Sequence, residues 1–203
     1  MSDTYDLLTL AEGKRALKIG PNSTDKDTQL AMYITGVSRA MDDTFGPSVN
    51  RTVTGELHDG GVPVIFPRKW PVSSVTTVVE YDQTTAGTLT AESVTSQPTD
   101  SYLLDNNGIS IRRRNAGSDT YFASGRRNIY VTYVAGRAAS TSAVDAQFKL
   151  GAALFLKNVW RAEEQGVIEL DEFDVPRQNF PSFAVPNAVK ELLKDYLQAA
   201  PEF

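Results

Sequence analysis

Apolar positions near the N-terminus recur every three or four residues, which is the repeat of helices that bury one face. Thr9 and Glu12 have the spacing of a capping box, in which each side chain satisfies a backbone donor at the other's position. A first helix is therefore predicted to run from there towards Gly20. A second helix is predicted from about Thr24 to Gly46. Its apolar face consists of Leu30, Ile34, Val37, Met41 and Phe45.

Between about residues 50 and 136 the period changes to two, the repeat of a β-strand. Asn106-Asn107-Gly108 predicts a tight hairpin, since Asn-Gly tolerates the positive φ angles that such turns need. The Thr- and Ser-rich stretch 84–99 indicates a weak strand or a mobile loop. The other predicted strands carry Val62, Val64 and Phe66; Val75, Thr77, Val79 and Tyr81 on one face; Tyr102 to Leu104 with Ile109 and Ile111; and Ile129, Val131 and Tyr133.

A third helix is predicted from about Val144 to Glu164. Its centre is apolar nearly all round, as expected of a buried helix, and Gly151 leaves room for another helix to approach closely. After Gly166 the chain is acidic, then rich in Pro and Phe, and a short final helix is predicted to begin at Pro186. Its apolar stripe is Val189, Leu192, Leu193, Tyr196 and Leu197.

The expected fold class is α+β: a small helical bundle with an inserted antiparallel β-sheet and an extended C-terminal arm. The bundle combines two N-terminal helices, a long third helix and a short C-terminal helix. Residues 1–165 are expected to form one domain, with helices in 5–46 and 143–165 and the β insertion at about 50–136. Residues 166–203 are expected to form the extended arm and the terminal helix. The 203 residues suffice for a conventional core without disulfides.

Composition excludes much chemistry. The chain has no cysteine and one histidine, which removes thiol nucleophiles, iron–sulfur clusters, Cys-based zinc sites and multi-His metal sites. That histidine, His58, precedes Asp-Gly-Gly and is interpreted as part of a turn. No phosphate-binding loop or nucleophile elbow is present, and the paired carboxylates are adjacent on helices, so they point in different directions. The sequence predicts no catalytic residue, metal ligand or cofactor site, and no enzyme.

The charge and hydropathy of the chain bear on whether the protein binds nucleic acid, is exported or enters a membrane. The net charge of −5 argues against a nucleic-acid binder as a whole, although a local basic patch would not show in the total. The first residues are acidic and polar, unlike a signal peptide, and no apolar run approaches the roughly 20 residues of a membrane span. A soluble, unexported protein without a membrane partner is expected.

A basic segment lies between two predicted strands. Residues 112–127 contain five arginines and one aspartate, Asp119, a local net charge of +4. The simplest interpretation is a solvated loop. The functional alternative is contact with phosphate or with an acidic protein surface, since guanidinium groups pair with both. The candidate contact residues are Arg112, Arg113, Arg114, Arg126 and Arg127.

An acidic segment without Lys or Arg runs from Glu163, at the end of the third predicted helix, to Asp174. A chain with separate basic and acidic patches can associate head to tail, and such contacts form rings when they close. The acidic candidates are Glu163, Glu164, Glu169, Asp171, Glu172 and Asp174. Beyond Gly166, the prolines between Phe173, Phe180 and Phe183 prevent a compact helix. This arm is too apolar for water and is expected to pack on its own domain or on a neighbour.

The order of these elements resembles a known family. A Leu-Thr-Leu-Ala-Glu opening is followed by the helix end from Met41 to Gly46, the block from Pro67 to Val75, a strand with Tyr102 and Asp105, and the strand from Asn128 to Gly136. A helix rich in small residues comes next. Over about residues 5 to 165 the chain is similar to the head–tail connector adaptor (head-completion) family of tailed bacteriophages.

The resemblance implies a structural protein of the virion's head–tail junction, made in the host cytoplasm. Adaptors of this family form a ring of about a dozen copies beneath the portal, extend the DNA channel and offer a docking surface to the next neck or tail protein. The implied partners are therefore the portal protein, further copies of the chain, that next protein, and packaged double-stranded DNA passing through the channel. Alternatives are another neck component, such as a stopper or tail-end protein, and a β-rich module that binds a polyanion or carbohydrate.

The resemblance also suggests places for the candidate residues. The acidic patch and the arginines can meet between subunits, and the arginines can face the DNA channel or the next ring. Because packaged DNA must slide, tight arginine–phosphate pairing would hinder it, which favours a protein partner for Arg112 to Arg114. The possible portal-binding arm comprises Phe173, Val175, Phe180, Phe183, Leu192, Leu193 and Tyr196.

Overall fold

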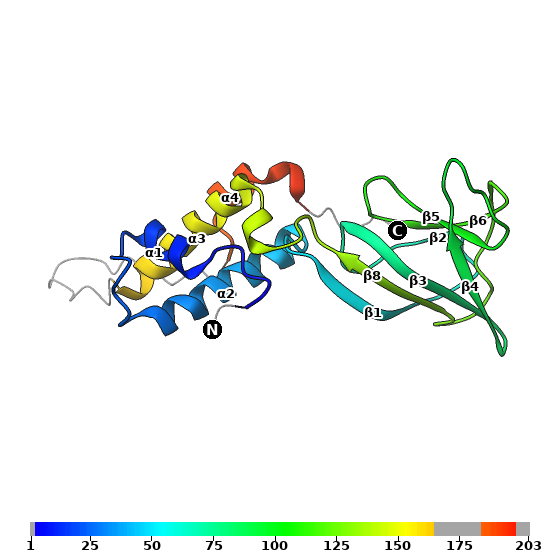
Figure 1. Cartoon of the computed structure of the whole chain (residues 1–203), viewed down its shortest axis with the longest axis horizontal. Coiled ribbons are helices and arrows are strands. Elements are labelled where there is room, and N and C mark those ends of the chain that lie inside the picture. Colours follow the sequence, from blue (N-terminus) through cyan, green and yellow to red (C-terminus); the bar gives the residue numbers. More distant parts are fainter. Residues whose placement is uncertain (1–2, 165–183, 198–203) are drawn as a thin grey trace, which may run out of the picture. The chain divides into compact units, whose positions relative to one another are not determined.

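The structure is a computed structural model, and it describes residues 3–164 and 184–197 (Figure 1). The chain divides into two compact units. One unit, here the helical unit, combines Met1–Val49 with Ala138–Phe203. The other, the sheet unit, is Asn50–Arg137. The predicted division near residue 165 stays a prediction.

The helical unit has four α-helices among its described residues: α1 (Leu10–Leu17), α2 (Asp27–Phe45), α3 (Ala146–Glu164) and α4 (Asn187–Leu192). Short 3-10 helices cover Thr141–Ala143 and Lys194–Tyr196. The predicted capping box is confirmed, because the Thr9 side chain accepts from the Glu12 N–H and the Glu12 carboxylate accepts from the Thr9 N–H. α1 ends at Lys18, whose left-handed conformation stops it before Gly20.

One hydrophobic cluster forms the core of the helical unit. All five apolar residues predicted for the face of α2 belong to it, and α3 contributes Phe148, Phe155 and Leu156. The close approach predicted at Gly151 is confirmed: a Cβ there would lie 3.2 Å from Val189 and 3.3 Å from Leu193. α4 therefore packs on α3 at a position that has no side chain.

The sheet unit has eight strands: β1 (Arg51–His58), β2 (Val64–Ile65), β3 (Val72–Asp82), β4 (Thr85–Ala91), β5 (Ser101–Leu104), β6 (Ile111–Asn115), β7 (Ser118–Asp119) and β8 (Ile129–Ala135). They form one sheet in the order β1-β8-β3-β4-β5-β6-β2, and β7 pairs with β6. Every pairing is antiparallel except that of β4 with β5, which is parallel. The hairpin predicted around Asn106 joins β5 to β6, through a longer loop in which Gly108 has a φ of +65°.

A second hydrophobic cluster belongs to the sheet unit, and Ile129, Val131 and Tyr133 of β8 are fully buried in it as their alternation predicts. The prediction for β3 was wrong. Its register against β8 shifts between Val75 and Thr77, so Val75 lies opposite the buried Tyr133 while Val79 lies opposite the exposed Tyr130. A bulge inserts one residue and moves all later side chains to the other face.

The predicted fold class, a helical bundle with an inserted antiparallel sheet, is corrected by the structure. The fold is α+β and is built on an eight-stranded, mostly antiparallel sheet, with only four α-helices in the described part of the chain. The physical reason is that the strands bury their own alternating apolar residues in a separate core, so the sheet is a principal structural unit. The predicted extended arm lies largely outside the described residues.

Candidate interaction surfaces

The structure separates the five predicted arginines into two groups. Arg112, Arg113 and Arg114 lie in β6, where successive side chains point to opposite faces of the sheet. Arg126 and Arg127 lie in the loop that leads into β8. The run of arginines that looks uniform in the sequence therefore occupies quite different environments.

Arg113 is part of a buried ionic network. Its side chain is 6% exposed and donates to Glu80 Oε1 at 2.6 Å and to Asp100 Oδ1 at 2.9 Å. Burial disfavours the charged guanidinium, but its hydrogen bonds to the carboxylates of Glu80 and Asp100 outweigh this effect and raise the pKa of Arg113. This side chain holds β3 and β6 together and is not available to a partner.

Arg114 and Arg112 meet carboxylates of the same unit. Arg114 pairs with Glu92 at 3.3 Å and with Asp119 at 2.5 Å, and it also donates to the Gly117 carbonyl. Arg112 lies 3.6 Å from Asp119, and its side chain is 46% exposed. Of the three arginines in β6, Arg112 alone has a substantially exposed side chain.

Arg126 and Arg127 are different. Both residues are exposed, and within the described residues neither side chain makes a hydrogen bond or an ion pair. Their loop is nevertheless fixed. The Asn128 side chain donates to the carbonyls of Tyr81 and Ala123 at 3.0 and 2.8 Å. Two free guanidinium groups are thus carried by a structured loop.

A buried polar cluster on β1 was missed by the sequence analysis. Glu56 accepts from the Tyr133 hydroxyl at 2.7 Å and from the Arg68 N–H at 2.9 Å. His58 Nε2 is 2.9 Å from Glu56 Oε1, but the contact is not aligned as a hydrogen bond. His58 is the last residue of β1, whereas the sequence indicated that it belongs to a turn.

Charge and burial act together in this cluster. Burial raises the pKa of a carboxyl group, but for Glu56 the contacts with His58, Tyr133 and the Arg68 N–H outweigh it and lower the pKa. Burial and the hydrogen bond to Glu56 raise the pKa of Tyr133, so its hydroxyl stays a donor at neutral pH. The cluster joins β1, β8 and the loop after β2. We interpret it as structural.

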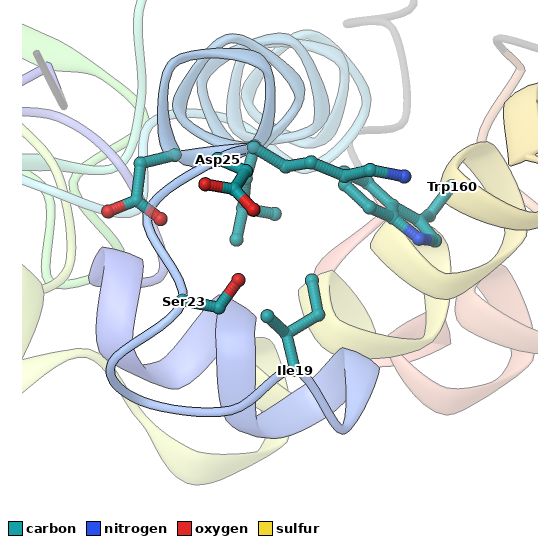
Figure 2. A pocket seen from close by; sticks show the side chains of 7 residues that line it. Ile19, Ser23, Asp25 and Trp160 are labelled. Carbon is teal, nitrogen blue, oxygen red and sulfur yellow. The ribbon is translucent and has the colours of Figure 1, made fainter.

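The helical unit has a hollow of about 260 Å³ (Figure 2). Lys14 Nζ, beside it, is bonded to Asp27 at 2.6 Å and to the Ser23 carbonyl at 2.7 Å. Lys26 Nζ lies 5.4 Å from the centroid of a Trp160 ring. These cations are used by the unit itself, so the hollow carries no assignment of a ligand. Its lining residues are Ile19, Ser23, Asp25, Lys26, Asp27, Leu30 and Trp160.

The predicted arm and acidic patch are only partly described. Leu193 is fully buried in the core of the helical unit, and Leu192 and Tyr196 pack against that core. These three residues therefore contact their own unit. The remaining predicted residues, or their side chains, lie outside the described part of the structure: Phe173, Val175, Phe180, Phe183, Glu163, Glu164, Glu169, Asp171, Glu172 and Asp174.

The described residues bring no three His, Asp or Glu side chains together in a way that could hold a metal ion. None of their helices is long and apolar enough to cross a membrane.

Comparison with known proteins gives a match of fold alone. No protein-family model matches the chain, and no curated protein matches its sequence. A chain in the structure of the neck of an empty gene transfer agent (GTA) particle, computed with C6 symmetry, matches with a TM-score of 0.57 and 15% identity. A chain in the virion of a native GTA particle matches with a TM-score of 0.56 and 15% identity. Each match covers 97% of this chain and 92% of the other.

The likeness shows the fold alone. Chains found in gene transfer agent particles, one of them in the neck of such a particle, share the α+β fold of this chain. The match extends over nearly the full length of both chains and so includes both units. At 15% identity it carries no residue roles.

Proposed function

We propose that this protein is a structural component of the neck of a phage-like particle, at the junction of head and tail. The observation that carries the proposal is the shared fold with a chain of a particle neck, over 97% of this chain and 92% of that one. It agrees with the sequence resemblance to head–tail adaptors, which rests on different information. In this role the protein binds other proteins and catalyses no reaction.

The more specific role that we propose is that of an adaptor. Copies of the chain form a ring of about a dozen beneath the portal, and the ring extends the DNA channel and presents a docking surface to the next neck or tail protein. The Phe-rich arm, with Phe173, Phe180 and Phe183, contacts the portal. The acidic segment 163–174 contacts basic residues of a neighbouring subunit.

The structure guides the design of the test. Removing residues 167–203 would also remove Val189 and Leu193, which belong to the core of the helical unit. The arm is better tested by replacing Phe173, Phe180 and Phe183 with serine while α4 stays intact. Mass photometry of the wild-type protein with its cognate portal ring then measures the copies added.

The outcomes separate the alternatives. A mass increase of about a dozen copies that is lost in the triple serine variant supports the adaptor role and the contact of the arm with the portal. An increase that persists in the variant supports the adaptor role and removes the arm from the contact. Binding to another neck ring, with none to the portal, would make the protein a different neck component and contradict the adaptor role.

A further inference from the structure

Two loops form one structured end of the sheet unit, which we call the arginine tip: residues 59–62 after β1 and residues 120–128 before β8. Backbone bonds join the two loops. The Gly60 N–H donates to the Gly125 carbonyl at 2.9 Å, and Phe122 and Val62 are paired by an N–H···O bond of 3.0 Å. The Arg127 N–H donates to Asp59 Oδ1 at 2.6 Å.

The tip is attached to the rest of the sheet unit by packing and hydrogen bonds. Phe122 is 1% exposed and belongs to the core of the sheet unit. The Asn128 side chain ties the loop to the end of β3, and the Ala123 N–H donates to Glu80, the carboxylate that also holds Arg113. Gly60 fits so closely that a Cβ there would lie 1.8 Å from the Ala123 carbonyl oxygen. The conformation of the tip is therefore preorganised by packing and hydrogen bonds.

The exposed side chains of the tip are those of a binding surface. The side chains of Arg126 and Arg127 make no hydrogen bond or ion pair within the described residues, although arginines of β6 in the same unit pair with carboxylates. Tyr121 is 68% exposed, next to the buried Phe122. Exposed tyrosine and arginine on a rigid support are the residues that most often dominate protein–protein interfaces.

We propose that the arginine tip docks on an acidic surface of the next protein in the neck, with Arg126 and Arg127 as the pairing residues. This inference rests on the proposed function and names the contact through which it is carried out. The exposed carboxylate of Asp59 and the aromatic ring of Tyr121 in the same surface suit a mixed protein interface better than a row of phosphates.

The proposal differs from what the arginine-rich sequence suggested. Arg113 and Arg114 hold the sheet together and Arg112 pairs with Asp119, so the docking residues are the last two of the five. Because both residues are exposed and their side chains make no hydrogen bond or ion pair within the described residues, their replacement is expected to leave the fold intact. A binding defect in such a variant therefore reports on the interface.

The test compares three proteins by interferometry, each against immobilised cognate portal ring and immobilised cognate next neck protein. They are the wild type, R126E/R127E, and K157E/R161E, a control with the same charge change at exposed positions of α3. We expect R126E/R127E to bind the next neck protein at least about tenfold more weakly, with portal binding unchanged. The control is expected to match the wild type, and all three to unfold at the same temperature.

Two further measurements sharpen the result. R126K/R127K keeps both charges but loses the bidentate geometry of guanidinium, so an intermediate affinity is expected. The affinity of the wild type is expected to fall with added salt more steeply than that of R126E/R127E. Both measurements distinguish ionic docking from a nonspecific effect of the substitutions.

Several outcomes would overturn the proposal. Unchanged binding of R126E/R127E to the next neck protein, with portal binding intact, removes the tip from the interface while the proposed function stands. Loss of binding to a short DNA duplex in place of the neck protein makes the tip a nucleic-acid contact, and loss of self-association in sedimentation velocity makes it a contact between copies. If the wild type bound neither portal nor neck protein, the proposed function would be wrong and this inference with it.

Discussion

Arg112 and Arg113 are adjacent residues of one type in one strand, and their burial differs because β6 alternates between its two faces. Arg113 is 6% exposed and bonded to Glu80, whose side chain is 13% exposed, whereas Arg112 is 46% exposed. Replacing Arg113 with alanine leaves the Glu80 carboxylate buried without its main cation. We expect R113A to lower the free energy of unfolding by about 3 kcal/mol, measured by urea denaturation.

Arg112 provides the matched control. R112A removes a surface contact of 3.6 Å and is expected to cost less than about 1 kcal/mol. Removing both partners tests the mechanism: E80Q/R113M should recover part of the loss, since no buried charge is then left unpaired. Equal effects of R112A and R113A would show that the network does not stabilise the sheet unit.

Glu56 makes the stability depend on pH. Its pKa lies below the ordinary value of 4.5, so its ionised form stabilises the native state above that pH, and the contribution is lost as the pH falls through the native pKa. The Tyr133 hydroxyl donates to Glu56 Oε2 and the Arg68 N–H donates to Oε1, whereas a glutamine would have an accepting oxygen at only one of these two positions. We expect E56Q to cost about 1–3 kcal/mol at pH 7 and less in acid, measured by urea denaturation across pH. A difference from the wild type that stays constant with pH would contradict this role.

Single residues also show which information a sequence lacks, namely the partners of a side chain that are distant along the chain. The run Arg112 to Arg114 and its strand period can be seen, but the partners Glu80 and Glu92 are 33 and 22 residues away. Only the pairing of β6 within the sheet brings them close. The sequence likewise does not show that the side chains of Arg126 and Arg127 lack carboxylate partners among the described residues, because the fold decides which carboxylates lie near them.

At the scale of elements, local sequence signals were sufficient to predict the features that depend on contacts between residues close together in the sequence. The capping box of α1 and the apolar face of α2 are confirmed, because both depend on contacts three or four residues apart. The bulge in β3 was not predictable in this way. It is a property of the pairing with β8, and no residue near Val75 marks it in the sequence.

Gly36 gives a prediction at this scale. It lies within α2 on an exposed part of the surface, and a Cβ there would meet nothing within 4 Å. Alanine restricts the unfolded chain more than glycine and suits a helix better. We expect G36A to raise the free energy of unfolding by about 0.5–1 kcal/mol in thermal and urea unfolding.

Gly151 is the comparison. It too lies inside a helix, but a Cβ would stand 3.2–3.4 Å from Val189, Leu193 and Met41. The gain in helix propensity is then opposed by crowding, so G151A is expected to give less stabilisation than G36A, and G151L to lower stability by separating α4 from α3. A stabilising G151L would show that α4 does not pack there.

For the whole molecule, the change of hydrophobic period near residue 50 coincides with the boundary between the two units. The period alone did not show that the strands have a core of their own, which is why the fold class was predicted wrongly. Whether alternating strands bury their apolar face on helices or on each other depends on the topology of the sheet. Here Val78, Ile111 and Phe122, from distant parts of the sequence, meet in one cluster.

Two separate cores predict two separable responses to mutation. The cluster around Phe45 and Leu156 belongs to the helical unit, and the cluster around Tyr133 belongs to the sheet unit. We expect R113A to reduce hydrogen-exchange protection in β3, β6 and β8 and to leave α2 and α3 unchanged, while G36A raises protection only in the helices. In the double variant the two effects should add within about 0.5 kcal/mol. If either substitution changed the protection of both units equally, the chain would unfold as one cooperative body, because the loss of one core would then carry the other with it.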